Sequence, residues 1–132
     1  MLFRSYGTGT VTGTATVQGS AKVYGGGIVQ GAAIVDNGAS VFGAAQVTDA
    51  SILGDASVLE SAIITGDATI QGSCLVYGNA TVAGPAIVQG GASVFGSAAV
   101  SGTAIVQGNA SVSGTAVVGN GDVIDGNTVV TS

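Results

Sequence analysis

Few side chains in this sequence could do chemistry. Histidine is absent, Cys74 is the single cysteine, and Arg4 and Lys22 are the only cations beside seven Asp and Glu residues. A nucleophilic enzyme needs a nucleophile next to a general base, and Ser, Thr and Asp alone form no such pair. We therefore predict no catalytic residues, no enzymatic activity and no cofactor.

Cys74 cannot form an internal disulfide, because it is the single cysteine. It stands where the repeat described below usually has alanine, and this position favours a small buried side chain over a reactive thiol.

Oxygen ligands for a metal ion gather in the segment VGNGDVIDGN. Asn120, Asp122 and Asp125 could offer amide and carboxylate oxygens to Ca²⁺, and the segment weakly resembles a calcium-binding nonapeptide repeat. A single copy is weak support for a metal site. A locally reset corner or an irregular terminal coil is the favoured interpretation, and calcium binding is left open.

These residues belong to a repeat that covers nearly the whole chain. From Ser5 onward the sequence divides into six-residue units of the form V-x-G-x-A-x, such as VTGTAT from Val11 and VYGNAT from Val76. The segment 47–51 has five residues and lacks the glycine of the third position. Residues 1–4 fall outside the repeat and resemble a cloning remnant, whereas residues 5–132 form one continuous domain.

Each unit alternates apolar and polar residues, as a half-buried strand requires, and its glycine gives the backbone freedom for a corner. Taking every third unit aligns like residues in columns at the position after the leading valine. The aromatic column is Tyr6, Tyr24, Phe42, Leu59, Tyr77, Phe95 and Ser113, and the polar column is Gln18, Asp36, Leu53, Gln71, Gln89, Gln107 and Asp125. Three units, or 18 residues, therefore make one coil, and about seven coils stack at a strand spacing of roughly 4.8 Å.

The leading Val or Ile and the fifth-position Ala of each unit are predicted to point inward. Val29 and Ile64 represent the first set, and Ala33 and Ala68 the second. A β-branched residue beside a small one fills a narrow triangular bore. We expect the five-residue unit to tighten one coil without shifting this inward column.

The units VYGNAT and VQGNAS and the three-unit coil resemble the hexapeptide-repeat superfamily, in its simple V-x-G-N-A-x form. The resemblance implies an all-β fold, a left-handed parallel β-helix in the form of a triangular solenoid. Acyltransferases of this superfamily use a histidine base and usually an added loop or helical segment, which this sequence lacks. A fragment of such a transferase, or of an adhesin, is therefore a minor alternative.

Charge is scarce, at 7% of residues with a net charge of −5. Nucleic-acid binding and a polybasic membrane patch both need clustered Lys and Arg, and Gly, Ser, Thr or Gln interrupts every long apolar run that a membrane helix would need. We therefore expect no nucleic-acid partner and no membrane insertion. The expected partner is another copy of the chain, outside the cell or at its surface, although no signal peptide is visible.

The leading functional hypothesis is a structural, self-assembling solenoid that forms a filament or part of a fibre. Neither end shows a polar or irregular cap, and an uncapped edge recruits another strand. The predicted end-stacking residues are Ser5, Tyr6, Thr8, Thr10, Val11, Val123, Ile124, Val129 and Val130. The aromatic column, from Tyr6 to Phe95, is predicted either to pack along the coil or to dock a lateral partner. The glutamines of the polar column, Gln18, Gln71, Gln89 and Gln107, form a second ladder.

Ice binding is the main alternative, because a flat, uncharged face with Thr-x-Thr rows can order water. Thr10-Val11-Thr12 fits that motif. The following coils place Ile28 and Gln30, and then Gln46 and Thr48, at the same positions. A regular array of two threonine columns is therefore not expected.

Overall fold

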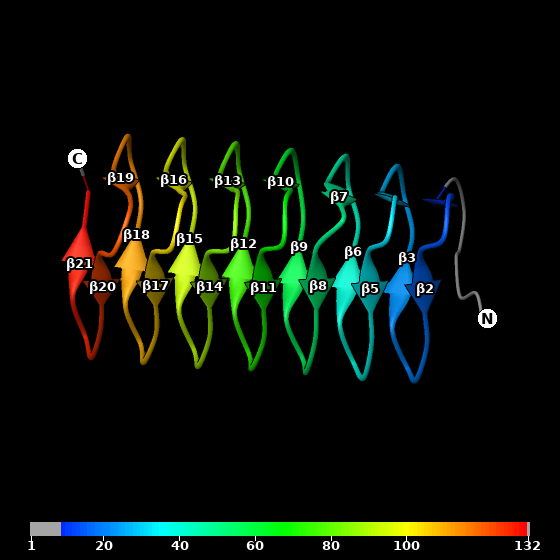
Figure 1. Ribbon diagram of the computed structural model, residues 1–132, viewed down its shortest axis with the longest axis horizontal. Helices are drawn as coiled ribbons and strands as arrows, with labels where there is room; N and C mark the ends of the chain where they lie inside the picture. Colours follow the sequence, from blue (N-terminus) through cyan, green and yellow to red (C-terminus); the bar gives the residue numbers. More distant parts are fainter. Residues whose placement is uncertain (1–8, 132) are drawn as a thin grey trace.

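The chain folds as an all-β solenoid of about seven coils (Figure 1), seen in a computed structural model that describes residues 9–131. Three parallel sheets of seven strands each run along its three sides. The first sheet contains β1 (Thr10–Val11), β4 (Ile28–Gln30), β7 (Gln46–Thr48), β10 (Ile63–Ile64), β13 (Thr81–Val82), β16 (Ala99–Val100) and β19 (Val117–Val118). The second contains β2 (Thr16–Val17), β5 (Ile34–Val35), β8 (Ser51–Ile52), β11 (Thr69–Ile70), β14 (Ile87–Val88), β17 (Ile105–Val106) and β20 (Val123–Ile124). The third contains β3 (Lys22–Val23), β6 (Ser40–Val41), β9 (Ser57–Val58), β12 (Leu75–Val76), β15 (Ser93–Val94), β18 (Ser111–Val112) and β21 (Val129–Val130).

Consecutive strands belong to different sheets, so three strands complete one coil. Val11 pairs with Val29, and Ile64 pairs with Val82, each 18 residues further along the chain. The predicted 18-residue coil is therefore confirmed. The left hand that the family resemblance implies stays a prediction. No helix in the described part of the chain could span a membrane.

The inward columns predicted from the repeat form the core. Val29, Ile64, Ala33 and Ala68 are all buried, and the same holds for the equivalent residues of nearly every coil. Burying a valine contributes roughly 1.5–3 kcal/mol of transfer free energy. The core is therefore a continuous stack of small and β-branched side chains along the axis.

Backbone hydrogen bonds join each coil to the next, and the N–H groups of outward residues donate toward the coil that follows. The outward residue Thr12 donates its N–H to the carbonyl oxygen of Val29 at 2.9 Å, and Gln71 donates to Val88 at 2.9 Å. The pattern repeats at almost every outward strand position. The corresponding N–H groups of β20 and β21 in the last coil therefore point toward the open end of the solenoid.

The five-residue unit leaves the inward column in register, as predicted. Val47 pairs with Ile64, and both Ala50 and Ile52 are buried. Asp49 takes the corner position that glycine occupies in most units, with φ 58°, and the unit lacks the residue that normally follows. A left-handed backbone costs a residue with a β-carbon roughly 1–2 kcal/mol, less for Asp and Asn because their side chains can bond locally.

Candidate functional site

The aromatic column lies directly after the strands of the third sheet and forms two stacked pairs. The rings of Tyr24 and Phe42 have centroids 4.8 Å apart with an interplanar angle of 6°, and those of Tyr77 and Phe95 are 4.9 Å apart at 2°. Leu59 lies between the pairs in sequence order. All five side chains are half-buried. Each pair covers one face of each ring, so the column packs along the coil; lateral docking on it stays a prediction, and Tyr6 lies outside the described residues.

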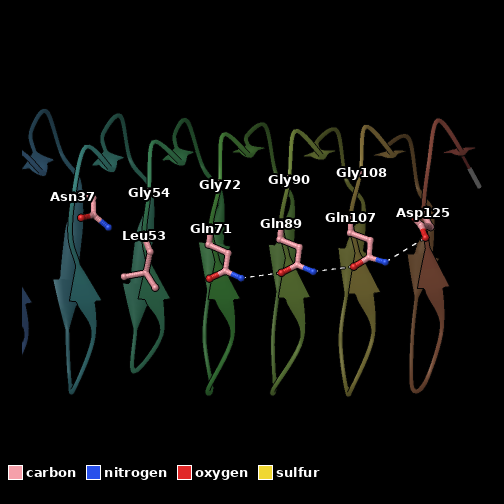
Figure 2. A pocket seen from close by; sticks show the side chains of 10 residues that line it. All are labelled: Asn37, Leu53, Gly54, Gln71, Gly72, Gln89, Gly90, Gln107, Gly108 and Asp125. Carbon is pink, nitrogen blue, oxygen red and sulfur yellow. Dashed lines mark hydrogen bonds between the residues drawn. The ribbon is translucent and has the colours of Figure 1, made fainter.

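The polar column forms a hydrogen-bonded ladder over its C-terminal half (Figure 2). The side-chain amide of Gln71 donates to Oε1 of Gln89 at 2.8 Å, and Gln89 donates to Gln107 at 2.8 Å. Gln107 in turn donates to Oδ2 of Asp125 at 3.3 Å. A shallow groove follows this ladder.

Leu53 interrupts the same column and cannot continue the bonding. On its N-terminal side, Gln18 donates to Oδ2 of Asp36 at 2.7 Å. The structure therefore brings the four predicted glutamines into one column but into two separate hydrogen-bonded groups. The repeat was enough to predict that these residues form one column. The break in the hydrogen-bonded ladder is indicated in the sequence only by the leucine at position 53.

The outward face of the first sheet is chemically mixed. Its strand positions carry Thr10, Ile28, Gln46, Ile63, Thr81, Ala99 and Val117 in register. Beside them, Gln30 donates its amide to Oγ1 of Thr48 at 3.0 Å. A two-column threonine array is not formed on this face of the described chain, and ice binding stays an untested prediction.

All seven carboxylates lie outside the strands, at or beside the corners, and Lys22 is the one charged residue on a described strand. Two corner carboxylates join neighbouring coils. Oδ1 of Asp49 accepts the N–H of Ala32 at 2.8 Å, and Oε2 of Glu60 accepts the N–H of Gly78 at 2.7 Å. The repeat pattern alone did not indicate these bonds, although an acidic residue in a glycine position was the available signal. The three flat faces are consequently almost neutral.

The single cysteine is part of the core, as expected. The thiol of Cys74 is buried and donates to the carbonyl oxygen of Gln71 at 2.9 Å. Burial raises the pKa of the thiol to about 11, although hydrogen bonds with the backbone of Ala92 and Gln71 oppose that rise. Such a thiol is a poor nucleophile at neutral pH.

The last coil differs from the others in its strands. The edge strands β19, β20 and β21 consist only of Val and Ile. The outward residues Val117, Val123 and Val129 are 71%, 56% and 65% exposed. The inward residues Ile124 and Val130 of this coil are half-buried, as is Val11 in the first described coil. The strands β19, β20 and β21 form an exposed edge of the described solenoid, called the open end below.

The predicted end-stacking residues lie partly at each end of the solenoid and partly outside the described residues. Val123, Ile124, Val129 and Val130 lie together on the open end, Thr10 and Val11 lie in the first described coil, and Ser5, Tyr6 and Thr8 lie outside the described residues.

The corner before β20 is reset by one residue. The left-handed conformation falls on Gly121, with φ 77°, rather than on Asn120 in the usual corner position. Oδ2 of Asp122 accepts the N–H of Gly119 at 3.0 Å, and Oδ1 of Asp125 accepts the N–H of Gly126 at 2.5 Å. Both predicted calcium ligands with carboxylates thus bind the chain's own donors, and in residues 9–131 no three His, Cys, Asp or Glu side chains converge as a metal site.

No family model, no curated protein and no solved structure matches this chain. The resemblance to the hexapeptide-repeat superfamily therefore rests on the repeat alone. A functional proposal for the chain has to be argued from its own surfaces.

Proposed function

We propose that this chain is a structural protein whose solenoids associate with one another to form a fibre. The observation that carries the proposal is the C-terminal coil, in which three adjacent edge strands are made of exposed and inward β-branched residues. Unpaired, apolar edge strands are templates for another strand. Here three of them lie at one end of one molecule.

The coil geometry favours end-to-end growth. Each sheet has seven strands, and β21 is the last strand of the third sheet. A strand that followed β21 along the coil would belong to the first sheet. A second copy could therefore follow with its β1 beyond β19, its β2 beyond β20 and its β3 beyond β21. All three sheets would continue across the contact.

Lateral contact would follow from the neutral faces. Ile34 and Ile63 are 39% and 38% exposed, and Leu75 is 42% exposed, with Lys22 as the one charge on the described strands. Little charge repulsion opposes the approach of two such faces. A location outside the cell or at its surface would suit a fibre and stays a prediction.

Electron microscopy of the purified chain tests the proposal. We expect filaments in which each copy adds seven strand spacings, roughly 33 Å. The variant Val123→Lys places a charge on the open edge and should shorten or abolish the filaments, because lysine protects edge strands from pairing.

The matched control is Ile87→Lys, which makes the same change on the same sheet away from the open edge. Discrete monomers of the unmodified chain at high concentration would contradict self-assembly. Filaments lost in Ile87→Lys but retained in Val123→Lys would assign growth to the faces instead of the end.

A further inference from the structure

The outward face of the second sheet repeats one pair of residues in neighbouring coils. Ile87 lies on β14 and Gln89 directly follows that strand, while Ile105 and Gln107 take the equivalent positions at β17. Side chains two positions apart along a strand point to the same side of the sheet. The face therefore carries an apolar column directly beside the glutamine ladder, and all four side chains are half-buried.

Each glutamine inside the ladder keeps hydrogen-bonding groups that the ladder does not use. A side-chain amide has two N–H donors and two acceptor lone pairs. Gln89 uses one donor toward Gln107 and one lone pair toward Gln71 (Figure 2). One N–H and one lone pair remain for a molecule that lies in the groove along the ladder. Because the rungs are one strand spacing apart, roughly 4.8 Å, a molecule that bonds every rung must repeat at that spacing.

A second copy of this chain has the required spacing. Facing sheets with identical columns can interlock their side chains, and glutamine ladders add hydrogen bonds to such a contact. The outward positions of β11, β14 and β17 carry no charged residue, so charge repulsion does not oppose self-pairing there. The other faces fit less well. The first sheet has only Ala99 and Ser101 at β16, and the third carries Lys22 and rings that already stack on one another.

The two columns determine how the second copy is oriented. A two-fold axis parallel to the solenoid axis exchanges the columns, so the amide of Gln89 would face isoleucine and lose hydrogen bonds. A parallel pair centred on the ladder instead sets Asp125 against its own counterpart, and like charges repel. A two-fold axis along the strands makes the solenoids antiparallel. Isoleucine then faces isoleucine and glutamine faces glutamine.

One antiparallel register satisfies both columns. When the axis passes between the coils of Gln89 and Gln107, each of these residues faces the other in the second copy. Gln71 then faces Asp125, and its remaining N–H can donate to that carboxylate. The two isoleucines of the apolar column also face each other in this register.

We propose that the face of the second sheet pairs with the same face of an antiparallel second copy, with Gln89 opposite Gln107 and Ile87 opposite Ile105. The inference rests on the proposed association of solenoids, and it names the face, the orientation and the register of their lateral contact. The strands β11, β14, β17 and β20 provide two outward side chains each, fewer than the roughly 20–30 residues a side of a standard interface. A single pair is therefore weak, and cross-linking at high protein concentration is the suitable measurement.

Cysteines placed three coils apart test the orientation. Thr69 on β11 faces Val123 on β20 in the proposed pair. A mixture of Thr69→Cys and Val123→Cys should therefore cross-link through a short bismaleimide, whereas neither variant alone should. A reagent shorter than three strand spacings, roughly 14 Å, cannot join identical positions in this arrangement. All variants also carry Cys74→Ala, and circular dichroism first shows that each is folded.

The matched control is a mixture of Ile63→Cys and Val117→Cys, which lie in the same two coils on the first sheet. This mixture should not cross-link. Adding Gln89→Ala to both second-sheet variants should lower their cross-linked yield about tenfold, because it removes hydrogen bonds on both sides of the two-fold axis. Should a cysteine variant fail to fold, Gln71→Cys with Asp125→Cys replaces the pair, since these positions also face each other.

The outcomes separate the inference from the proposed function. Cross-linking of Thr69→Cys with itself but not with Val123→Cys would show a parallel pair and overturn the inference, and so would equal cross-linking in the first-sheet control. Filaments without the expected cross-link would also overturn the inference, while the proposed function would stand. Cross-linked pairs without filaments would support the inference and overturn the fibre. If neither filaments nor cross-links form, both are wrong.

Discussion

The carboxylate of Asp49 accepts a hydrogen bond from the backbone N–H of Ala32, with 2.8 Å between Oδ1 and the nitrogen. At an ordinary corner this N–H donates to a backbone carbonyl of the next coil, as Thr14 donates to Gly31 at 3.0 Å. A side-chain oxygen therefore replaces a main-chain acceptor in the one unit that has five residues. This substitution lets the solenoid absorb a deletion while the inward column stays in register.

We predict that Asp49→Ala lowers the free energy of unfolding by about 1–2 kcal/mol, because it removes the acceptor and places alanine in a left-handed conformation. Asp49→Asn should stay within about 0.5 kcal/mol, since asparagine keeps a carbonyl oxygen and tolerates that conformation. Urea unfolding followed by circular dichroism measures both. Asp67→Ala, at an exposed corner, is the control, and equal losses in the Ala and Asn variants would show that the oxygen of residue 49 is unimportant.

The buried thiol predicts an alkaline loss of stability. Burial raises the pKa of the Cys74 thiol to about 11 in the folded chain, from an ordinary value of 9.0. The thiol has a higher pKa in the folded chain than in the unfolded chain. Its contribution to the free energy of unfolding is therefore complete below pH 9 and is lost as the pH rises toward 11. The free energy of unfolding should therefore decline over that range.

Cys74→Ala supplies the control for this prediction, because alanine is the usual residue at the fifth position. It should remove the part of the alkaline decline that belongs to the thiol. Labelling of the unmodified chain with a thiol reagent at pH 7.5 should occur only on unfolding. Rapid labelling of the native chain would show that Cys74 is accessible.

Breaking the glutamine ladder should cost stability at its centre. Gln89 accepts from Gln71 and donates to Gln107, so Gln89→Ala loses two hydrogen bonds, each contributing about 0.5–1.5 kcal/mol. We expect a loss of about 1–2 kcal/mol in thermal or urea unfolding. Gln46→Ala, at an exposed position outside the ladder, should change stability by less than about 0.5 kcal/mol; a similar loss there would mean that the ladder adds nothing specific.

The aromatic stack should contribute measurably as well. Tyr77→Ser, which copies the residue at Ser113 in the same column, removes the ring that stacks on Phe95. A stacked pair adds about 0.5–1.5 kcal/mol beyond area burial, so the variant should unfold earlier and lose near-ultraviolet circular dichroism. Tyr77→Phe keeps the ring and should unfold like the unmodified chain; an equal loss in that variant would assign the effect to the hydroxyl.

Most of the fold was predictable because equivalent positions recur in every unit of the repeat and have the same local environment. Val29 and Ala33 are inward for the same reason as their equivalents in other units: side chains alternate along a strand, and a corner follows every unit. The aromatic and polar columns followed from the same period. Cys74 was correctly placed in the core on that basis alone.

The candidate contact surfaces were predictable only in part. The period placed Gln71, Gln89 and Leu53 in one column, but it could not say which neighbours bond. The five-residue unit was expected to lack its corner glycine, but only the structure shows that the backbone of Asp49 takes the corner conformation and that its side chain joins two coils. An irregular corner was expected at Asp122, but only the structure shows that its carboxylate accepts the N–H of Gly119.

The sequence by itself determined the 18-residue coil, the inward columns and the positions of nearly all corners, because these depend on alternation and glycine spacing along the chain. The tertiary structure decided the hydrogen bonds between coils and which residue of the reset corner, Gly121, takes the left-handed conformation. Those features depend on distances and directions between atoms of neighbouring coils. A periodic pattern of residue types contains neither kind of information.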